Sequence, residues 1–212
     1  PGPLRLAWMR ELCPYAAVVH LADENPQDPS EHEDFWRVWR ESLRRVVPTP
    51  VDAVFASEPY GHRLAAELGA RFYPVDPLRT AIPISGTAIR ADPFGAMAYL
   101  PPPVRAHFAR RIAVFGPEST GKSTLTRALA GALGATVVPE YARTWLEAFP
   151  DALTAPDLEA IARGQAASED ALARCAGFVV CDTDPLLTTV WAERLLGAVP
   201  PGVAEHAART PA

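Results

Sequence analysis

The sequence predicts an α/β protein built from two units, each with a parallel sheet between helical layers. Short apolar runs alternate along the chain with stretches in which apolar residues recur at helical spacing, and this alternation is typical of parallel sheets. In addition, the glycine-rich segment 116–124 lies between an apolar run and a helical pattern. Strand, glycine-rich loop and helix, in that order, indicate a phosphate-binding P-loop.

The first half of the chain contains the elements of one such unit. Three apolar runs predict strands, at 17–21, 51–56 and 71–75. Helical spacing of apolar residues predicts a helix over 35–47, ended by Pro48, and a second over 64–68, ended by Gly69. The polar stretch 23–34, with its prolines, predicts a loop.

The second half repeats the same class of architecture without repeating the sequence. Three further apolar runs predict strands, at 111–115, 135–138 and 177–181. Helical patterns cover 122–133 and about 156–175. Between the halves, Pro101–Pro103 predicts stiff polyproline geometry. We place a domain boundary there, which gives domains at 1–104 and 105–212.

Composition excludes several classes of protein. With 212 residues and 49% hydrophobic content, the chain is long enough for well-packed cores. A net charge of −5 argues against a broad basic surface for nucleic acid. No long apolar run or signal-like N-terminus supports a membrane location. Three cysteines without metal-ligand spacing predict free buried thiols and a cytoplasmic protein, with a homo-oligomer left open.

The P-loop carries the clearest chemistry. Of the 20 basic residues only Lys122 is a lysine, and a compact ammonium fits a narrow phosphate loop better than a planar guanidinium does. We expect Lys122 to reach the β- and γ-phosphates of ATP and Ser123 to hold Mg²⁺. The predicted ATP-binding residues are Gly116, Glu118, Ser119, Thr120, Gly121, Lys122, Ser123 and Thr124.

Acidic residues follow the last predicted strand. Asp182 is placed to hold Mg²⁺, or to take a proton from the attacking hydroxyl, and Asp184 is the alternative base. Together with Lys122 they form the predicted catalytic set. Asp182 could instead cap the helix whose apolar pattern covers 190–196, because aspartate is common at helix N-termini.

The segment after the strand at 135–138 predicts an acceptor site. Glu140 could accept hydrogen bonds from ribose hydroxyls, and Arg143 could bind a phosphate, with Tyr141 between them. A simple surface ion pair between Glu140 and Arg143 is the alternative. Arg163 and Gln165 lie on the following helix and could also face the site.

In the first half, the string 84–90 combines small hydroxyl residues with a guanidinium. Ser85 and Thr87 open a short helix, and Arg90 lies one turn further on. Free backbone N–H groups at a helix start, together with an arginine, can bind a triphosphate. An ordinary capped helix with an exposed arginine is the alternative.

These residues carry a resemblance to a known family. The string 84–90 resembles the I-S-x-T-x-I-R motif of nicotinamide-mononucleotide adenylyltransferases, and 55–61 resembles a segment that these enzymes place near their substrate. The resemblance makes Ser57 and Tyr60 substrate-binding candidates. Followed by the P-loop, by Pro-Glu-Tyr-Ala-Arg and by Asp-Thr-Asp, the whole chain is similar to the bifunctional NadR family.

The resemblance implies a partial Rossmann-like nucleotidyltransferase followed by a P-loop kinase. Its implied function is ATP-dependent phosphorylation of ribosylnicotinamide at the 5'-hydroxyl, with ATP and Mg²⁺ as cofactors and a mononucleotide adenylyltransferase half, in NAD biosynthesis. The implied partners are therefore small nucleosides and nucleotides. Two alternatives remain open: a regulator that senses ATP or NAD without turnover, and a P-loop ATPase without a small acceptor.

The chain also departs from the family pattern. It has no H-x-G-H loop, and its histidines are isolated, at positions 20, 32, 62, 107 and 206. Because that loop supplies charge to the transferring phosphate in the family, we expect poor adenylyl transfer. We expect both ends to be cut, so that the first strand and histidine loop of the first domain, and the C-terminal lid of the kinase, are missing.

Overall fold

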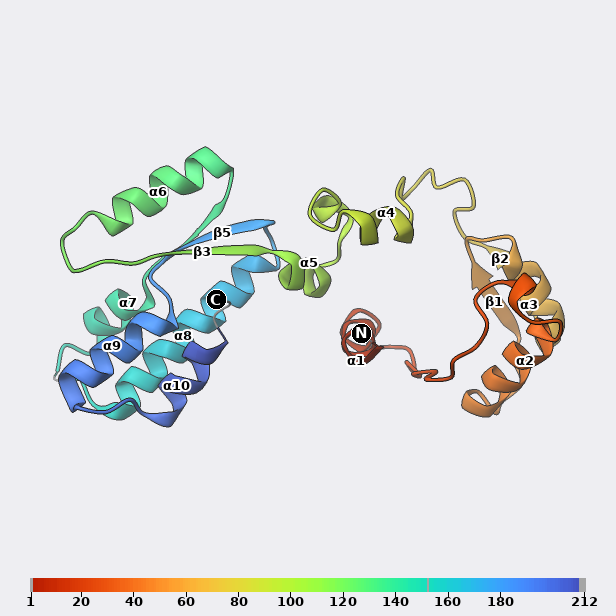
Figure 1. Cartoon of the computed structure of the whole chain (residues 1–212), viewed down its shortest axis with the longest axis horizontal. Coiled ribbons are helices and arrows are strands. Elements are labelled where there is room, and N and C mark those ends of the chain that lie inside the picture. The colour runs from red at the N-terminus through yellow and green to blue at the C-terminus, as the bar shows by residue number, and fades with distance from the viewer. Residues whose placement is uncertain (1, 152, 210–212) are drawn as a thin grey trace. The chain divides into compact units, whose positions relative to one another are not determined.

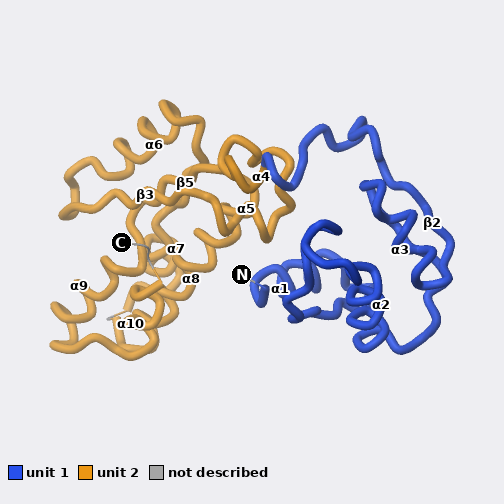
Figure 2. Tube along the Cα trace, turned by 45° about the vertical axis from the view of Figure 1, so that its right-hand side comes forward, with its two compact units in different colours: residues 1–88 blue, residues 89–212 orange. Residues whose placement is uncertain are grey.

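The computed structural model describes residues 2–151 and 153–209. The chain divides into two compact units, residues 1–88 and 89–212 (Figure 2). This division lies before the boundary that the prolines suggested, so the predicted domains 1–104 and 105–212 stay a prediction.

The second unit is built on a three-stranded parallel sheet. The strands are β3 (Arg110–Val114), β4 (Thr136–Val138) and β5 (Phe178–Asp182), and their order is β3-β5-β4. Two helices lie on opposite sides of the sheet, α6 (Lys122–Leu133) and α8 (Ala155–Ala173) (Figure 1). The expected α/β layering is therefore confirmed in this unit.

Burial alternates along β5, as a strand covered on both faces requires. Val179 and Cys181 pack with Ala173 of α8, whereas Val180 between them packs with Ala130 of α6. All three β5 side chains are almost completely buried. Since successive strand residues point to opposite faces, this one strand contributes to both cores.

Further helices complete the second unit. They are α5 (Pro102–Phe108), α7 (Tyr141–Ala148), α9 (Pro185–Leu196) and α10 (Pro201–Ala208). A third core, formed by Leu158, Ala162, Ala192 and Val203, joins α8, α9 and α10. The apolar patterns in the sequence predicted only the second half of α9 and did not predict α10.

The proline-rich stretch is not a polyproline linker. Pro101 precedes α5 in extended geometry, and Pro102 and Pro103 form the first turn of that helix. Proline is tolerated there because first-turn N–H groups have no intrahelical acceptor. The prolines therefore begin a helix that leads directly into β3.

In the first unit a helix packs on a two-stranded parallel sheet. The elements are α1 (Gly2–Leu12), α2 (Phe35–Val46), β1 (Ala53–Ala56), α3 (Tyr60–Leu68) and β2 (Arg71–Pro74), and α4 (Gly86–Ala91) crosses the division between the units. The predicted elements at 35–47, 51–56, 64–68 and 71–75 are confirmed. Gly69 ends α3 with φ 71°, a left-handed conformation that glycine adopts without steric cost.

The strand predicted at 17–21 is wrong. Those residues are irregular, and β1 and β2 pair only with each other among the described residues. An apolar run forms a strand only where a neighbour completes its hydrogen bonds. On the sheet, Phe55 stacks on Tyr73 with ring centroids 5.2 Å apart, and Phe55 is 66% exposed. The three-layer arrangement is therefore not observed in this unit.

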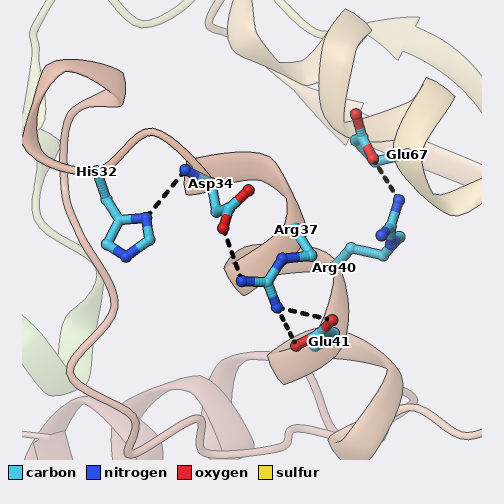
Figure 3. A network of polar contacts seen from close by, with 6 residues as sticks. All are labelled: His32, Asp34, Arg37, Arg40, Glu41 and Glu67. Atoms are coloured by element: carbon cyan, nitrogen blue, oxygen red, sulfur yellow. Dashed lines mark hydrogen bonds and ion pairs between the residues drawn. The ribbon is translucent and has the colours of Figure 1, made fainter.

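A surface network of charges accompanies the packing of α2 and α3. Arg37 bonds Asp34 at 2.8 Å and Glu41 at 3.3 Å along α2, and Arg40 reaches Glu67 of α3 at 2.9 Å (Figure 3). The Arg37 pairs are about half exposed, so water screens them and they contribute little to stability. The Arg40 pair joins two elements and has a partly buried partner.

Two expectations drawn from composition have different outcomes. No helix in residues 2–151 and 153–209 is long and apolar enough to cross a membrane. All three cysteines carry free thiols, but only Cys181 is buried, whereas Cys175 is exposed and Cys13 is partly exposed. The expectation of uniformly buried thiols is therefore wrong.

The close approach of α3 to its sheet yields a stability prediction. A Cβ at Gly61 would lie 2.5 Å from the Phe72 ring and 2.7 Å from Ala56 Cβ. Gly61→Ala should therefore destabilise the protein by about 1–3 kcal/mol. In Gly131→Ala the new Cβ meets no atom within 4 Å, so helix propensity should stabilise the protein by roughly 0.5–1 kcal/mol. Urea unfolding followed by circular dichroism measures both, and equal effects would contradict the packing.

Candidate functional site

Three strands of the second unit end side by side at one edge of the sheet. Val114 pairs with Asp182, and Val138 pairs with Cys181. The segments that leave these ends are the P-loop after β3, the 139–141 segment after β4 and the 183–184 turn after β5. Carboxyl ends of parallel strands are where α/β proteins bind ligands. The sheet therefore brings the three predicted site segments of this unit together.

The P-loop follows β3 with a backbone that only a few residues tolerate. Gly121 has φ 87° and Gly116 has φ 157°, and Ser119 is a non-glycine residue with φ 59°. Left-handed conformations at non-glycine residues cost about 1–3 kcal/mol and occur where function requires them. Gly121 is the N-cap of α6, so this curved backbone leads directly into the first turn of a helix. The geometry suits a phosphate near the free N–H groups of that turn.

The polar side chains of the loop converge on one carbonyl. Lys122 Nζ donates to the Pro117 oxygen at 2.7 Å, and the Thr120 hydroxyl donates to the same oxygen at 2.8 Å. Ser123 and Thr124 follow Lys122 in the first turn of α6. An ammonium held by one backbone acceptor keeps two further donors, which a phosphate can take up.

Asp182, at the end of β5, lies next to the P-loop serine. Ser123 Oγ donates to Asp182 Oδ2 at 2.5 Å. Asp182 is only 6% exposed, and its other oxygen, Oδ1, is buried without a hydrogen-bond partner in the described structure. A buried carboxylate oxygen without a donor is costly unless a cation or water completes it. A hydroxyl and a carboxylate are oxygen donors of the kind that Mg²⁺ takes in nucleotide sites, so the pair fits a metal bound mainly by phosphates.

Asp184 has a different role from Asp182. Asp184 is the N-cap of α9, and its Oδ1 accepts from Leu186 N at 2.8 Å and from Leu187 N at 3.3 Å. Helix caps of this kind contribute about 1 kcal/mol. The residue that caps the helix is therefore Asp184, and not Asp182 as the alternative interpretation of the sequence had it. The role of Asp184 as a catalytic base stays a prediction, and its side chain already caps α9.

A cavity of about 630 Å³ opens beside these strand ends. Its polar lining includes Glu118 and Lys122 of the P-loop, Glu140 after β4 and Gln165 of α8. Most of the remaining wall is apolar and comes from α7, α8, α9 and the segment between α7 and α8. Its apolar side chains are Ala142, Leu146, Leu153, Leu158, Ile161, Leu187, Val190, Trp191 and Leu195. This volume is large enough for a small ligand with an apolar ring.

The predicted acceptor segment divides between the cavity and the surface. Glu140 lines the cavity and pairs with Arg143 at 3.0 Å. Arg143 is 64% exposed, and it does not line the cavity as far as the chain is described, nor does Tyr141. The surface ion pair is thus observed together with the cavity position of Glu140. Phosphate binding by Arg143 stays a prediction.

Several lining residues were not singled out by the sequence. Thr183, Thr188, Trp191 and Arg194 line the cavity from β5's end and from α9. The apolar pattern at 190–196 indicated a helix but not which face meets a ligand. Of the two residues that the sequence offered on the following helix, Gln165 lies in the wall.

Beneath the cavity Gln165 contacts an unusual carboxyl. Gln165 Nε2 donates to Glu169 Oε1 at 3.2 Å, and both residues are buried. Burial raises the pKa of Glu169 to about 7, with Asp184 adding to the rise, while the Gln165 hydrogen bond and Arg111 oppose it. A carboxyl group that titrates near neutrality therefore lies one side chain away from the cavity wall.

The predicted residues of the first half lie at the end of β1 and around α4. Ser57 directly follows β1, and Tyr60 begins α3 with 56% of its surface exposed. Ser85 Oγ accepts from Ala88 N at 3.0 Å, which is ordinary capping of α4. Thr87 and Arg90 lie within that helix. A triphosphate site at 84–90 stays a prediction.

Comparison with known proteins finds similarity to an AAA domain and to NadR proteins. Residues 111–212 match the family model described as an AAA domain. The trifunctional NAD biosynthesis/regulator protein NadR of Escherichia coli (strain K12) is 32% identical, over 95% of this chain and 51% of that protein. Its counterpart in Salmonella typhimurium (strain LT2) is 31% identical, over 94% and 51%. The chain thus spans about half the length of the curated relatives it matches.

Solved structures agree on the fold. A NadR protein in complex with NAD and AMP-PNP superimposes with a TM-score of 0.72 at 24% identity, covering 100% of this chain and 65% of that one. A NadR protein in complex with NR gives a TM-score of 0.66 at 25% identity, with coverages of 97% and 61%. The α/β architecture with parallel sheets is therefore shared with these proteins.

The raised pKa of Glu169 predicts a pH-dependent stability. Between about pH 4.5 and 7 the folded state binds more protons at this carboxyl than the unfolded state, so stability falls as the pH rises through that window. Glu169→Gln removes this dependence. Relative to the unaltered chain, the variant should gain about 3 kcal/mol between pH 4.5 and 7.5.

Urea unfolding at a series of pH values measures this difference. Glu147→Gln, on the exposed side of α7, is the matched control for the exchange of a glutamate for a glutamine. A constant difference for Glu169→Gln would show that Glu169 titrates normally.

Proposed function

The chain is a homologue of the NadR proteins, and from this we propose that its second unit transfers the γ-phosphate of ATP to the 5'-hydroxyl of ribosylnicotinamide, a step in NAD biosynthesis. The observation that carries the proposal is a cavity with an apolar wall that is lined by Lys122 of the P-loop and by Glu140, next to the hydrogen-bonded pair of Ser123 and Asp182. The ligands of the solved NadR complexes, which are NAD, AMP-PNP and NR, support the substrate class.

ATP would bind with its phosphates at the P-loop. Backbone N–H groups of the loop and of the first turn of α6 would hold the phosphate oxygens, and Lys122 would leave the Pro117 carbonyl to reach the β- and γ-phosphates. The Ser123–Asp182 pair would hold Mg²⁺, which when bound neutralises charge between the phosphates.

The acceptor would occupy the apolar part of the cavity. Glu140 is the only carboxylate besides Glu118 that lines it within the described residues, and it can accept hydrogen bonds from ribose hydroxyls. Asp182 would serve either the metal or the proton of the attacking hydroxyl, because both roles call on the same unpartnered oxygen, Oδ1. The apolar wall would exclude water from the reaction.

The first unit would hold the product for the next step. We extend the proposal to a mononucleotide adenylyltransferase-like unit in which Ser57, Tyr60, Ser85 and Thr87 contact nucleotide. Binding of ATP and NAD without transfer to an acceptor would instead favour a sensor.

Removal of the lysine tests ATP binding. Lys122→Ala should weaken binding of ATP with Mg²⁺ at least about tenfold, because a charge-assisted hydrogen bond to phosphate is lost. Isothermal titration calorimetry measures the affinity. Arg127→Ala, which removes an exposed cation from the same helix α6, is the matched control. Equal affinity of Lys122→Ala and the unaltered chain would refute the assignment.

Removal of the carboxylate charge tests the metal and the transfer step. Asp182→Asn should lower kcat for phosphate transfer to ribosylnicotinamide by roughly a hundredfold and raise the Mg²⁺ concentration needed for half-maximal rate. Asp151→Asn, at an exposed position, should behave like the unaltered chain. An Asp182→Asn variant with the original Mg²⁺ dependence would remove Asp182 from the metal site.

A further inference from the structure

We propose that Gln165 is a positioning residue. It fixes Glu140, the proposed acceptor-binding carboxylate, relative to the end of β5, where Asp182 lies. This inference rests on the proposed kinase function. Gln165 is 2% exposed. Its side-chain amide contacts two backbone segments that flank functional residues. The amide Oε1 accepts from Tyr141 N at 2.9 Å, and Nε2 donates to the Thr183 oxygen at 3.4 Å.

The orientation of this amide is unambiguous. Tyr141 N can only donate and the Thr183 carbonyl can only accept, so the oxygen of Gln165 must face the first and its nitrogen the second. Nε2 has a second acceptor in Glu169. A side chain that cannot both donate and accept would leave Tyr141 N, the Thr183 oxygen or both without this hydrogen bond.

On the acceptor side, Gln165 holds the start of α7. Tyr141 is the first residue of α7 and Glu140 is its N-cap, and the Glu140 side chain makes no capping hydrogen bond to the helix. The N–H groups of a first turn have no intrahelical acceptor, so Gln165 supplies one from another helix. Glu140 is thereby held where it lines the cavity.

The neighbouring glycine permits this approach. A Cβ at Gly164 would lie only 2.2 Å from Cε1 of Tyr141. The Tyr141 ring therefore lies directly over α8 at a position where no side chain other than hydrogen fits. Two consecutive residues of α8 thus contact the start of α7: Gly164 packs against the Tyr141 ring, and Gln165 accepts a hydrogen bond from Tyr141 N.

On the metal side, Gln165 holds a strained turn. Thr183, between Asp182 and Asp184, has φ 76° and is 5% exposed. A β-branched residue rarely adopts this conformation, so the surroundings must maintain it. The Gln165 hydrogen bond to the Thr183 carbonyl is one such restraint, and Asp184 capping α9 is another.

Replacement by a similar apolar side chain separates this role from simple packing. Gln165→Met keeps the length of the side chain but leaves Tyr141 N and the Thr183 oxygen without it. We expect kcat for phosphate transfer to fall at least about tenfold, with the KM for ATP changing less than about twofold, because the P-loop is not touched. The control Ser168→Ala removes a hydrogen bond internal to α8, from the Ser168 hydroxyl to the Gly164 oxygen, and should keep the original kcat.

Gln165→Glu gives a signature that packing alone would not. A protonated carboxyl can accept from Tyr141 N and donate to the Thr183 oxygen, whereas a carboxylate cannot donate. The variant's kcat should therefore recover as the pH is lowered, whereas the unaltered chain should show no such recovery. Of the charged groups, Glu169 is hydrogen-bonded to Gln165, and Glu118, Lys122, Glu140 and Arg194 line the same cavity. Asp170, Asp184 and Arg111 act on Glu169 in turn.

Hydrogen exchange provides a readout that does not depend on activity. In the full chain, the Tyr141 amide of Gln165→Met should exchange at least about tenfold faster than in the unaltered chain, and Ser168→Ala should leave it unchanged. NMR measures this amide directly. Circular dichroism checks that each variant is folded. If Gln165→Met does not fold, the pH dependence of Gln165→Glu provides the test instead.

The outcomes separate the two hypotheses. Unchanged Tyr141 exchange, or an unchanged kcat in a folded Gln165→Met, overturns the positioning role while leaving the kinase assignment intact. Absence of transfer by the unaltered chain overturns the proposed function, and the positioning role falls with it. Faster exchange together with a lower kcat, and recovery of Gln165→Glu at low pH, supports both.

Discussion

The parallel pairing of β3, β5 and β4 is the constraint on which the rest of the second unit depends. Both faces of β5 are buried, by α8 on one side and α6 on the other. A slip of one residue would exchange the two faces of a strand and expose its core side chains. The hydrophobic core therefore fixes the register that places Val114 opposite Asp182, and with it the distance between Ser123 and Asp182. In this way apolar packing positions polar chemistry.

Two aspartates only two residues apart take different roles because of the backbone between them. Asp182 is the last residue of β5, whereas Asp184 already caps α9. Thr183 turns the chain with a left-handed conformation, so one carboxylate stays with the sheet and the other serves the helix. The strain is offset by the hydrogen bonds on either side of it. A freely rotating turn would leave neither carboxylate fixed.

Local patterns predicted the elements whose determinants are local. The bounds of α6 and the strands of the second unit agree with the apolar spacing and the glycine-rich loop, since each element contains its own signal. The run at 17–21 failed because a strand also needs a partner, which the run does not encode. The role of Gln165 could not be predicted, because it arises from contacts with residues 24 positions before it and 18 after it. Tertiary roles of this kind have no periodicity to detect.

The single lysine of the chain can be understood from the loop that surrounds it. Lys122 Nζ and the Thr120 hydroxyl share the Pro117 carbonyl, within a loop whose Gly116 already has Thr120 and Lys122 close by. A guanidinium presents its donors in a fixed plane, so it cannot bind one carbonyl and turn its other donors toward phosphate in so small a space. An ammonium has three donors around a single atom and can rotate between these acceptors. Elsewhere in the chain arginine forms ion pairs, often between elements, as Arg111 does with Asp170 at 2.9 Å. The composition thus reflects two different requirements. Inside the loop a small ammonium group must reach the phosphate, and elsewhere planar guanidinium groups form ion pairs.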